Sequence, residues 1–278
     1  MTREEALRTS ILNYYTDRYP EVFDRILRAA DLDADLFCLM GAENYIFKTG
    51  GVLWAVDPMF NTPRSGITRE AVKDRLHELF DRLDFVLLTH SHIDHLDTEL
   101  FRLFPKLKLI VPDHLINWIP PECENVTCVH YGDSLTIGDI RIDAFRSLHY
   151  DKGTTVGVEE TGYKVTAGKY ALLFPTDVRE YDAAKYPDLG TVTHVFGHVW
   201  LGRRKALDYP QSGLCAEQAA FLTSFGARVI YLAHIAEAER EPEDLWTYAH
   251  AGLLTDTILT RQPDANVRIP MLGYPEFL

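Results

Sequence analysis

The stretch Thr89-His90-Ser91-His92-Ile93-Asp94-His95-Leu96-Asp97 carries four potential metal ligands within six residues. It follows residues 84–88, an apolar run that predicts a buried strand. In an extended chain, residues two apart point to the same side, so His90 and His92 can converge on one metal ion. The stretch therefore predicts a metal site at the end of a strand.

Asp94 and His95 come after the chain begins to turn, where they can face a neighbouring ion. The alternative is a solvated polar loop with a chance excess of histidine. Imidazoles and a carboxylate packed this densely behind a strand favour the metal site.

Three further candidate ligands each follow a predicted strand, and they are His149, Asp177 and His234. A lone histidine or aspartate after a strand is more often a cap or turn residue. Their recurrence together with the 90–95 cluster favours one shared site.

Length and composition are those of an ordinary soluble globular protein, with 278 residues, 46% hydrophobic and 25% charged. No apolar stretch approaches the roughly 20 residues that a membrane span needs. The charged N-terminus lacks the apolar segment of a secretion signal, which makes a cytoplasmic location the expectation. A formal net charge of −13 disfavours a nucleic-acid partner, because such binding depends on Lys and Arg neutralising phosphates. We expect a small-molecule substrate instead.

The order of predicted elements indicates an α+β protein. Residues 1–34 are expected to form a helical appendage that starts at a Thr2–Glu5 capping box and is broken at Pro20. It is expected to pack on the body of the protein or on a second subunit of a homo-oligomer. Residues 35–278 are expected to form one domain of two sheets with helices outside both. The turn Thr49-Gly50-Gly51 predicts a hairpin at its start. A last helix is expected to start after Pro242 and to carry Leu245, Trp246, Ala249 and Leu253 on one face.

The chain resembles the metallo-β-lactamase superfamily, whose fold is a four-layer αββα sandwich. The resemblance runs from about residue 36 to the C-terminus and includes five motifs in order. His90-Ser91-His92-Ile93-Asp94-His95 matches the H-x-H-x-D-H signature. The other four motif positions are occupied by Asp57, His149, Asp177 and His234.

The resemblance implies a dinuclear site. Its first metal would be held by His90, His92 and His149, and its second by Asp94, His95 and His234. Asp177 would bridge the two metals, and Asp57 would be an outer acceptor that fixes a histidine ring. Nitrogen and carboxylate ligands suit two Zn²⁺ ions and leave Mn²⁺ or Fe²⁺ open. One departure is Thr176, where the family usually has a glycine before the bridging aspartate, and its Cβ is expected to tighten the turn.

Asp94 and His198 are the candidate catalytic residues. His198 ends a predicted strand and is interpreted as a general acid or an oxyanion donor, against the alternative of a histidine bonded within its own loop. Tyr150, Trp200 and Arg203 are candidate substrate contacts, although a solvated loop explains the last two as well.

The expected activity is hydrolysis of a small ester-like substrate, a phosphodiester or a lactone, by a metal-bound hydroxide. Leu96-Asp97 and the hairpin of residues 42–57 resemble the branch with ascorbate-6-phosphate lactonase and the N-acyl-phosphatidylethanolamine phospholipases. The alternative is a nuclease of the same fold. A redox role is disfavoured by the lack of room for a flavin domain, and a scaffold role by the complete ligand set.

Overall fold

The computed structural model describes residues 2–59, 69–210, 213–237 and 240–278. The chain divides into two compact units. Unit 1 comprises Met1–Val129, Glu237–Arg240 and Pro270–Leu278, and unit 2 comprises His130–Ala236 and Glu241–Ile269. Each unit contains one seven-stranded sheet among the described residues.

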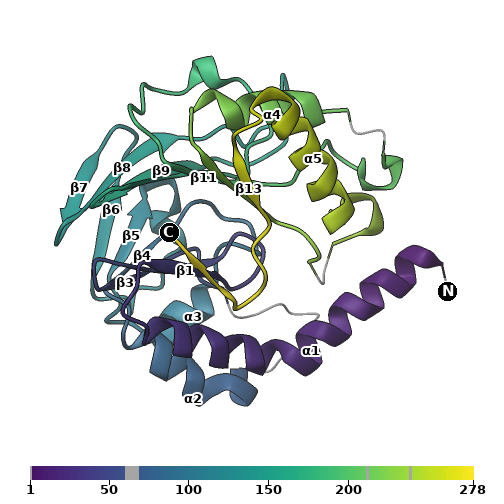
Figure 1. The fold of residues 1–278 in the computed structure, drawn as a ribbon. Helices are drawn as coiled ribbons and strands as arrows, with labels where there is room; N and C mark the ends of the chain where they lie inside the picture. The colour runs from purple at the N-terminus through teal and green to yellow at the C-terminus, as the bar shows by residue number, and fades with distance from the viewer. Residues whose placement is uncertain (1, 60–68, 211–212, 238–239) are drawn as a thin grey trace. The chain divides into compact units, whose positions relative to one another are not determined.

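Among its described residues, unit 1 combines its sheet with three α-helices. In sheet order its strands are β14 (Pro275–Phe277), β1 (Leu36–Leu39), β2 (Tyr45–Thr49), β3 (Val52–Val56), β4 (Phe85–Leu87), β5 (Leu109–Pro112) and β6 (Val126–Val129). Its helices are α1 (Arg3–Ala30), α2 (Arg69–Phe80), α3 (Thr98–Leu103) and the 3-10 helix η1 (Asp113–Trp118). Helices α1 and α2 lie side by side on one face of this sheet (Figure 1). An ion pair of 2.5 Å between Arg75 Nε and Asp24 Oδ1 joins them.

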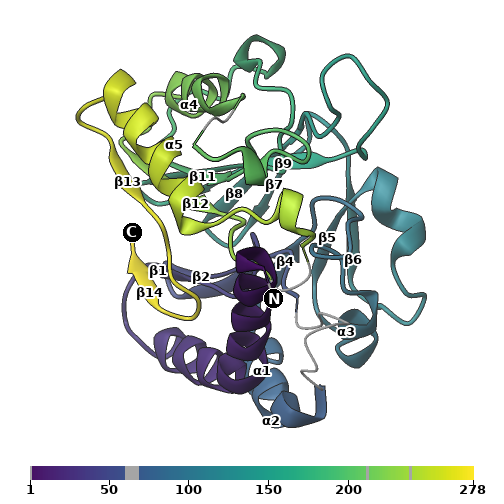
Figure 2. The ribbon, with the colours of Figure 1, turned by 90° about the vertical axis from the view of Figure 1, so that its right-hand side faces the viewer.

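Unit 2 repeats this arrangement. In sheet order its strands are β13 (Asn266–Arg268), β12 (Val229–Ala233), β11 (His194–His198), β10 (Tyr170–Thr176), β9 (Thr161–Ala167), β8 (Ile140–Arg146) and β7 (Ser134–Ile137). Its helices are α4 (Cys215–Ser224), α5 (Tyr248–Arg261) and the 3-10 helices η2 (Ala183–Lys185), η3 (Ala206–Asp208) and η4 (Pro242–Asp244). Helices α4 and α5 pack together over strands β11 and β12 (Figure 2).

Strand direction explains where polar side chains gather. In unit 1, β3, β4, β5 and β6 are parallel, and in unit 2, β10, β11, β12 and β13 are parallel. Strand β8 runs in the same direction as β10, because each is antiparallel to β9. The carboxyl ends of β8, β10, β11 and β12 therefore share one edge of their sheet, and those of β3 and β4 share one edge of theirs.

The N-terminal segment differs from the sequence prediction at Pro20. The Thr2–Glu5 capping box is confirmed, but α1 continues through Pro20 as one helix to Ala30. A proline inside a helix removes one hydrogen bond and costs about 3 kcal/mol. The loss is offset by the buried face that Tyr19, Val22 and Phe23 present around it. No helix among the described residues has the length and apolar character that crossing a membrane requires.

Two local predictions have different outcomes. The hairpin is confirmed, since Thr49 pairs with Val52 and both intervening glycines have the positive φ of a tight turn.

The last helix was expected to carry Leu245 and Trp246, but it begins at Tyr248. His250 explains this start, because its Nδ1 accepts the backbone N–H of Thr247 at 3.1 Å and caps the helix there.

Candidate metal centre

The unit 1 part of the candidate site lies where β3 and β4 end. Asp57 follows β3, and its backbone N–H donates to the Leu87 carbonyl at 2.9 Å. Thr89 and His90 follow β4. Asp57 has a φ of 42°, in the left-handed region that a non-glycine residue adopts at a cost. The backbone is thus bent to bring the Asp57 carboxylate to the edge that carries the histidines.

Asp57 acts as a buried acceptor. Its Oδ1 accepts the Thr89 backbone N–H at 2.8 Å. Its Oδ2 bonds to Nδ1 of His95 at 2.8 Å and to the Thr89 hydroxyl. Burial raises the pKa of the Asp57 carboxyl group, while the bonds from His95 and Thr89 oppose that shift. With both oxygens engaged, Asp57 is suited to fix the His95 ring, which leaves Nε2 as the nitrogen that can bind a metal.

The signature histidines gather around this carboxylate. His90 is fully buried, and its Nδ1 lies 2.9 Å from the Thr89 hydroxyl. The His90 ring centroid lies 4.1 Å from that of His95 and 4.8 Å from that of His92. One potential ligand atom each from Asp57, His90 and His95 lies within 4.8 Å of the others. The local sequence pattern therefore produces a cluster that could hold a metal.

Asp94 is held by two neighbours that the sequence did not reveal. Its carboxylate forms an ion pair with Arg240, whose Nε donates to Glu237 at 2.6 Å. Its backbone carbonyl accepts from Nδ2 of Asn44 at 3.0 Å, and the same amide nitrogen donates to the Asp57 carbonyl at 2.7 Å. Both the side chain and the backbone of Asp94 are thus fixed.

The unit 2 part of the site lies along one edge of its sheet. His149, Asp177, His198 and His234 come after or at the ends of β8, β10, β11 and β12 respectively. All four are buried. Nε2 of His234 lies 3.2 Å from Oδ1 of Asp177. The fold therefore brings together four predicted site residues that lie far apart in the sequence, from His149 to His234.

Glu160 is a further residue that sequence reasoning missed. It is 1% exposed, and its Oε1 lies 3.3 Å from Nδ1 of His149 and accepts the Asp177 backbone N–H at 3.0 Å. It serves His149 as Asp57 serves His95, by holding Nδ1 so that Nε2 can bind a metal. Each unit thus contains one buried carboxylate–histidine pair.

Backbone strain accompanies the ligands of unit 2. Thr176 has a φ of 61° and His234 a φ of 63°. A threonine at positive φ is an outlier because its branched Cβ crowds the backbone. The expected consequence of having Thr176 in place of glycine was a tighter turn. The structure shows instead a left-handed residue that glycine would adopt without strain.

His198 is a buried histidine beside the predicted ligands. It is 3% exposed, and its ring centroid lies 6.0 Å from that of His234. Burial lowers the pKa of His198 to about 3, so the imidazole is neutral at pH 7. Within the part of the chain that the structure describes, its Nε2 has no hydrogen-bond partner. A histidine that is bonded within its own loop through Nε2 would have such a partner, and His198 has none among the described residues.

The candidate substrate contacts lie in unit 2. Tyr150 follows His149 and is half-buried. The Trp200 carbonyl accepts from the Tyr181 hydroxyl at 2.6 Å. Arg203 is partly exposed and pairs with Asp151, its Nε donating to Oδ2 at 2.6 Å. Arg203 is therefore balanced by a carboxylate, which the sequence did not indicate.

The donors of both clusters fit divalent metal ions. Imidazole nitrogens and carboxylate oxygens are the ligands that zinc, manganese and iron take in proteins. Histidine ligands characteristically direct their second nitrogen to a carboxylate or carbonyl, as His95 and His149 do here. The two clusters could therefore hold divalent metal ions.

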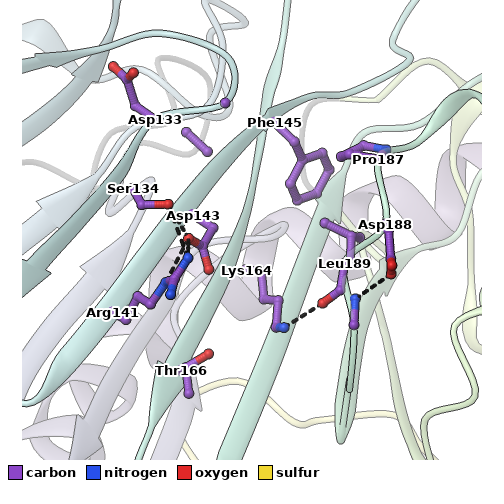
Figure 3. Close-up of a pocket in the computed structure, with 13 residues that line it drawn as sticks. Asp133, Ser134, Arg141, Asp143, Phe145, Lys164, Thr166, Pro187, Asp188 and Leu189 are labelled. Carbon is purple, nitrogen blue, oxygen red and sulfur yellow. Dashed lines mark hydrogen bonds and ion pairs between the residues drawn. The ribbon is translucent and has the colours of Figure 1, made fainter.

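A separate groove of about 520 Å³ in unit 2 lies over β8 and β9 (Figure 3). Arg141 pairs with Asp143 at 2.8 Å, and Lys164 donates to the Leu189 carbonyl. The predicted ligands are not among its described lining residues. Both basic side chains are engaged by these contacts, so we assign the groove no role in the reaction.

Solved structures share this fold at low sequence identity. A metallo hydrolase of Ignicoccus hospitalis, Igni18, is 15% identical with a TM-score of 0.65, covering 88% of this chain and 98% of its own. The metallo-β-lactamase fold protein YhfI of Bacillus subtilis is 17% identical with a TM-score of 0.62, covering 88% and 99%. CmlA of Streptomyces venezuelae, a diiron β-hydroxylase, is 15% identical with a TM-score of 0.62, covering 89% of this chain and 55% of its own. Such likeness confirms the predicted α+β metallo-β-lactamase fold and leaves the reaction open.

No curated protein matches the chain. The family described as "Beta-lactamase superfamily domain" matches residues 55–235, a span that starts just before Asp57 and ends just after His234. It thus includes every candidate ligand of both units. The chain therefore belongs to the beta-lactamase superfamily.

Proposed function

We propose that the chain is a metal-dependent hydrolase that holds two divalent ions, Zn²⁺ in first place and Mn²⁺ or Fe²⁺ otherwise. His90, His92 and His149 would bind the first ion, and Asp94, His95 and His234 the second, with Asp177 bridging. The observation that carries the proposal is the pair of buried carboxylate–histidine contacts, Asp57 with His95 and Glu160 with His149. Such contacts orient metal-binding imidazoles.

The proposed substrate is a small phosphodiester or lactone, as in the branch that the sequence resembles. When bound, divalent ions lower the pKa of water from 15.7 to about 7 and polarise the substrate oxygen. Asp94, fixed by Arg240 and Asn44, is positioned to accept the proton of the attacking water. A nuclease of the same fold remains the alternative, which the net charge of −13 disfavours.

His198 is proposed to donate a hydrogen bond to the oxygen that gains negative charge. A buried, neutral imidazole has one N–H to donate and no additional proton to transfer, which favours the oxyanion role over that of general acid.

Metal analysis and a substrate screen test the hydrolase proposal. The purified protein is expected to contain about two ions per chain. It is expected to cleave bis-p-nitrophenyl phosphate or a panel of lactones, with thioesters and RNA as further members of the screen. Turnover of RNA alone would support the nuclease. Protein with a full metal complement and no hydrolysis of any of these substrates would contradict the proposal.

Replacing His198 with alanine is expected to lower kcat about 10²–10³-fold, the loss typical of one oxyanion donor. KM and metal content should stay near the wild-type values, because His198 is proposed to stabilise only the negative charge that develops in the transition state. His198→Gln, which retains an N–H donor, is expected to recover part of the rate. Unchanged kcat in the alanine variant would remove His198 from the reaction.

A further inference from the structure

Two arginines of unit 2 share one carboxylate next to the candidate ligands. Arg203 donates to Asp151 through Nε at 2.6 Å and through Nη2 at 3.3 Å. Arg179 Nη1 lies 3.6 Å from the same carboxylate. Asp244 also interacts electrostatically with Arg203, so Arg179 is the positive charge with the more distant carboxylate contact of the two.

The chain holds this positive charge close to the predicted ligands. Asp151 comes two residues after His149, and Arg179 comes two residues after Asp177. The Arg179 backbone N–H donates to the Leu148 carbonyl at 2.8 Å, which ties the two segments together. Arg179 therefore belongs to the same sheet edge as His149 and Asp177.

Packing makes Arg179 the better placed of the two arginines. Its side chain is 12% exposed, whereas that of Arg203 is 44% exposed. Its guanidinium lies over the Trp200 ring, 5.5 Å from the centroid. A planar guanidinium held against an aromatic face loses less side-chain conformational entropy on binding a ligand than an unrestrained one does.

We propose that Arg179, supported by Trp200, binds an anionic group of the substrate beside the bond that is cleaved. The substrate class would then be an ester or lactone that carries a carboxylate or a phosphate. A guanidinium suits either group, because its parallel N–H donors match two anionic oxygens. Asp151 holds Arg179 in place and offsets part of its charge when no anion is bound. The inference rests on the proposed hydrolase function and narrows its substrate.

Paired substrates test the inference. Arg179→Met is expected to raise KM about 10–100-fold for a p-nitrophenyl ester that carries a free carboxylate, and to change KM less than about twofold for its methyl-ester counterpart. Arg179→Lys, which keeps the charge without the planar donors, should fall between. Arg141→Met removes an arginine ion-paired with Asp143 elsewhere in unit 2 and should leave both KM values unchanged. Equal KM changes for the charged and neutral esters would overturn the inference.

Anion binding by the full-length purified protein gives a second measurement that needs no turnover. The dissociation constants of inorganic phosphate and of succinate are expected to rise about tenfold or more in Arg179→Met and to stay constant in Arg141→Met. The anion that loses more affinity identifies the preferred group. If the wild type hydrolyses nothing, the hydrolase proposal fails while this binding comparison still decides the subsite. If Arg179→Met binds both anions as Arg141→Met does, the subsite is wrong.

Discussion

Replacing His149 with alanine is expected to lower hydrolysis at least about 10³-fold and to reduce the metal content below two ions per chain. His149 is fully buried, and its Nδ1 contacts Glu160, so no other orientation of the ring is equivalent. Alanine would remove one of three proposed imidazole ligands of the first ion. The remaining two would bind that ion too weakly to retain it through purification.

The measurement is elemental analysis of the variant together with its rate on the best substrate of the screen. His130→Ala is the matched control, because His130 is exposed and contacts Asp133 at the turn that precedes β7. That variant should keep the wild-type metal content and rate. His149→Ala with two ions and full activity would exclude His149 as a ligand and require a different metal site.

The sequence predicted those positions in the site that depend on a single strand or on neighbouring strands that end at one edge. The strand before His90 fixes the direction of the chain, and His90 and His92 follow its end with ring centroids 4.8 Å apart. Polar residues after predicted strands, such as Asp177 and His234, could be grouped because parallel strands end at a common edge. The positions of these side chains could be anticipated where one strand or one shared edge sufficed, and their metal binding stays a prediction.

Glu160 could not be predicted, because its role depends on pairing between strands. It precedes β9, where Thr161 lies opposite Arg146 of β8. Its carbonyl accepts the Ser147 backbone N–H at 3.0 Å, which brings its side chain to His149. A glutamate before a strand carries no signal of its own in the sequence. The register of β8 against β9 makes it the acceptor for His149, a proposed metal ligand.

Other differences arise from tertiary packing that overrides local preference. Pro20 predicted a break, yet buried side chains around it keep α1 continuous. Thr176 predicted a tighter turn, yet the chain accepts it at a φ of 61° where Asp177 must be presented. No sequence motif indicated the ion pairs of Arg179 and Arg240. Their partners, Asp151 and Asp94, are distant in the sequence.

Replacing Glu160 is expected to weaken metal binding without removing any ligand. Glu160→Gln keeps an oxygen that can accept from His149 and Asp177 but loses the negative charge, so metal affinity should fall about tenfold. Glu160→Ala loses the acceptor as well, and the affinity should fall about 100-fold, with the His149 ring free to turn. A competition titration against a chelator of known affinity measures both values.

Glu159 supplies the control for this comparison. It is adjacent to Glu160 in sequence, its side chain is exposed, and it accepts from the Tyr131 hydroxyl at 3.2 Å. Glu159→Gln changes the net charge by the same amount and should leave the metal affinity unchanged. The melting temperature of each variant at saturating metal separates weak binding from poor folding. Wild-type metal affinity in a well-folded Glu160→Ala variant would show that His149 needs no outer carboxylate. The proposal would then lose the contact that, with Asp57–His95, distinguishes a metal centre from a chance cluster of histidines.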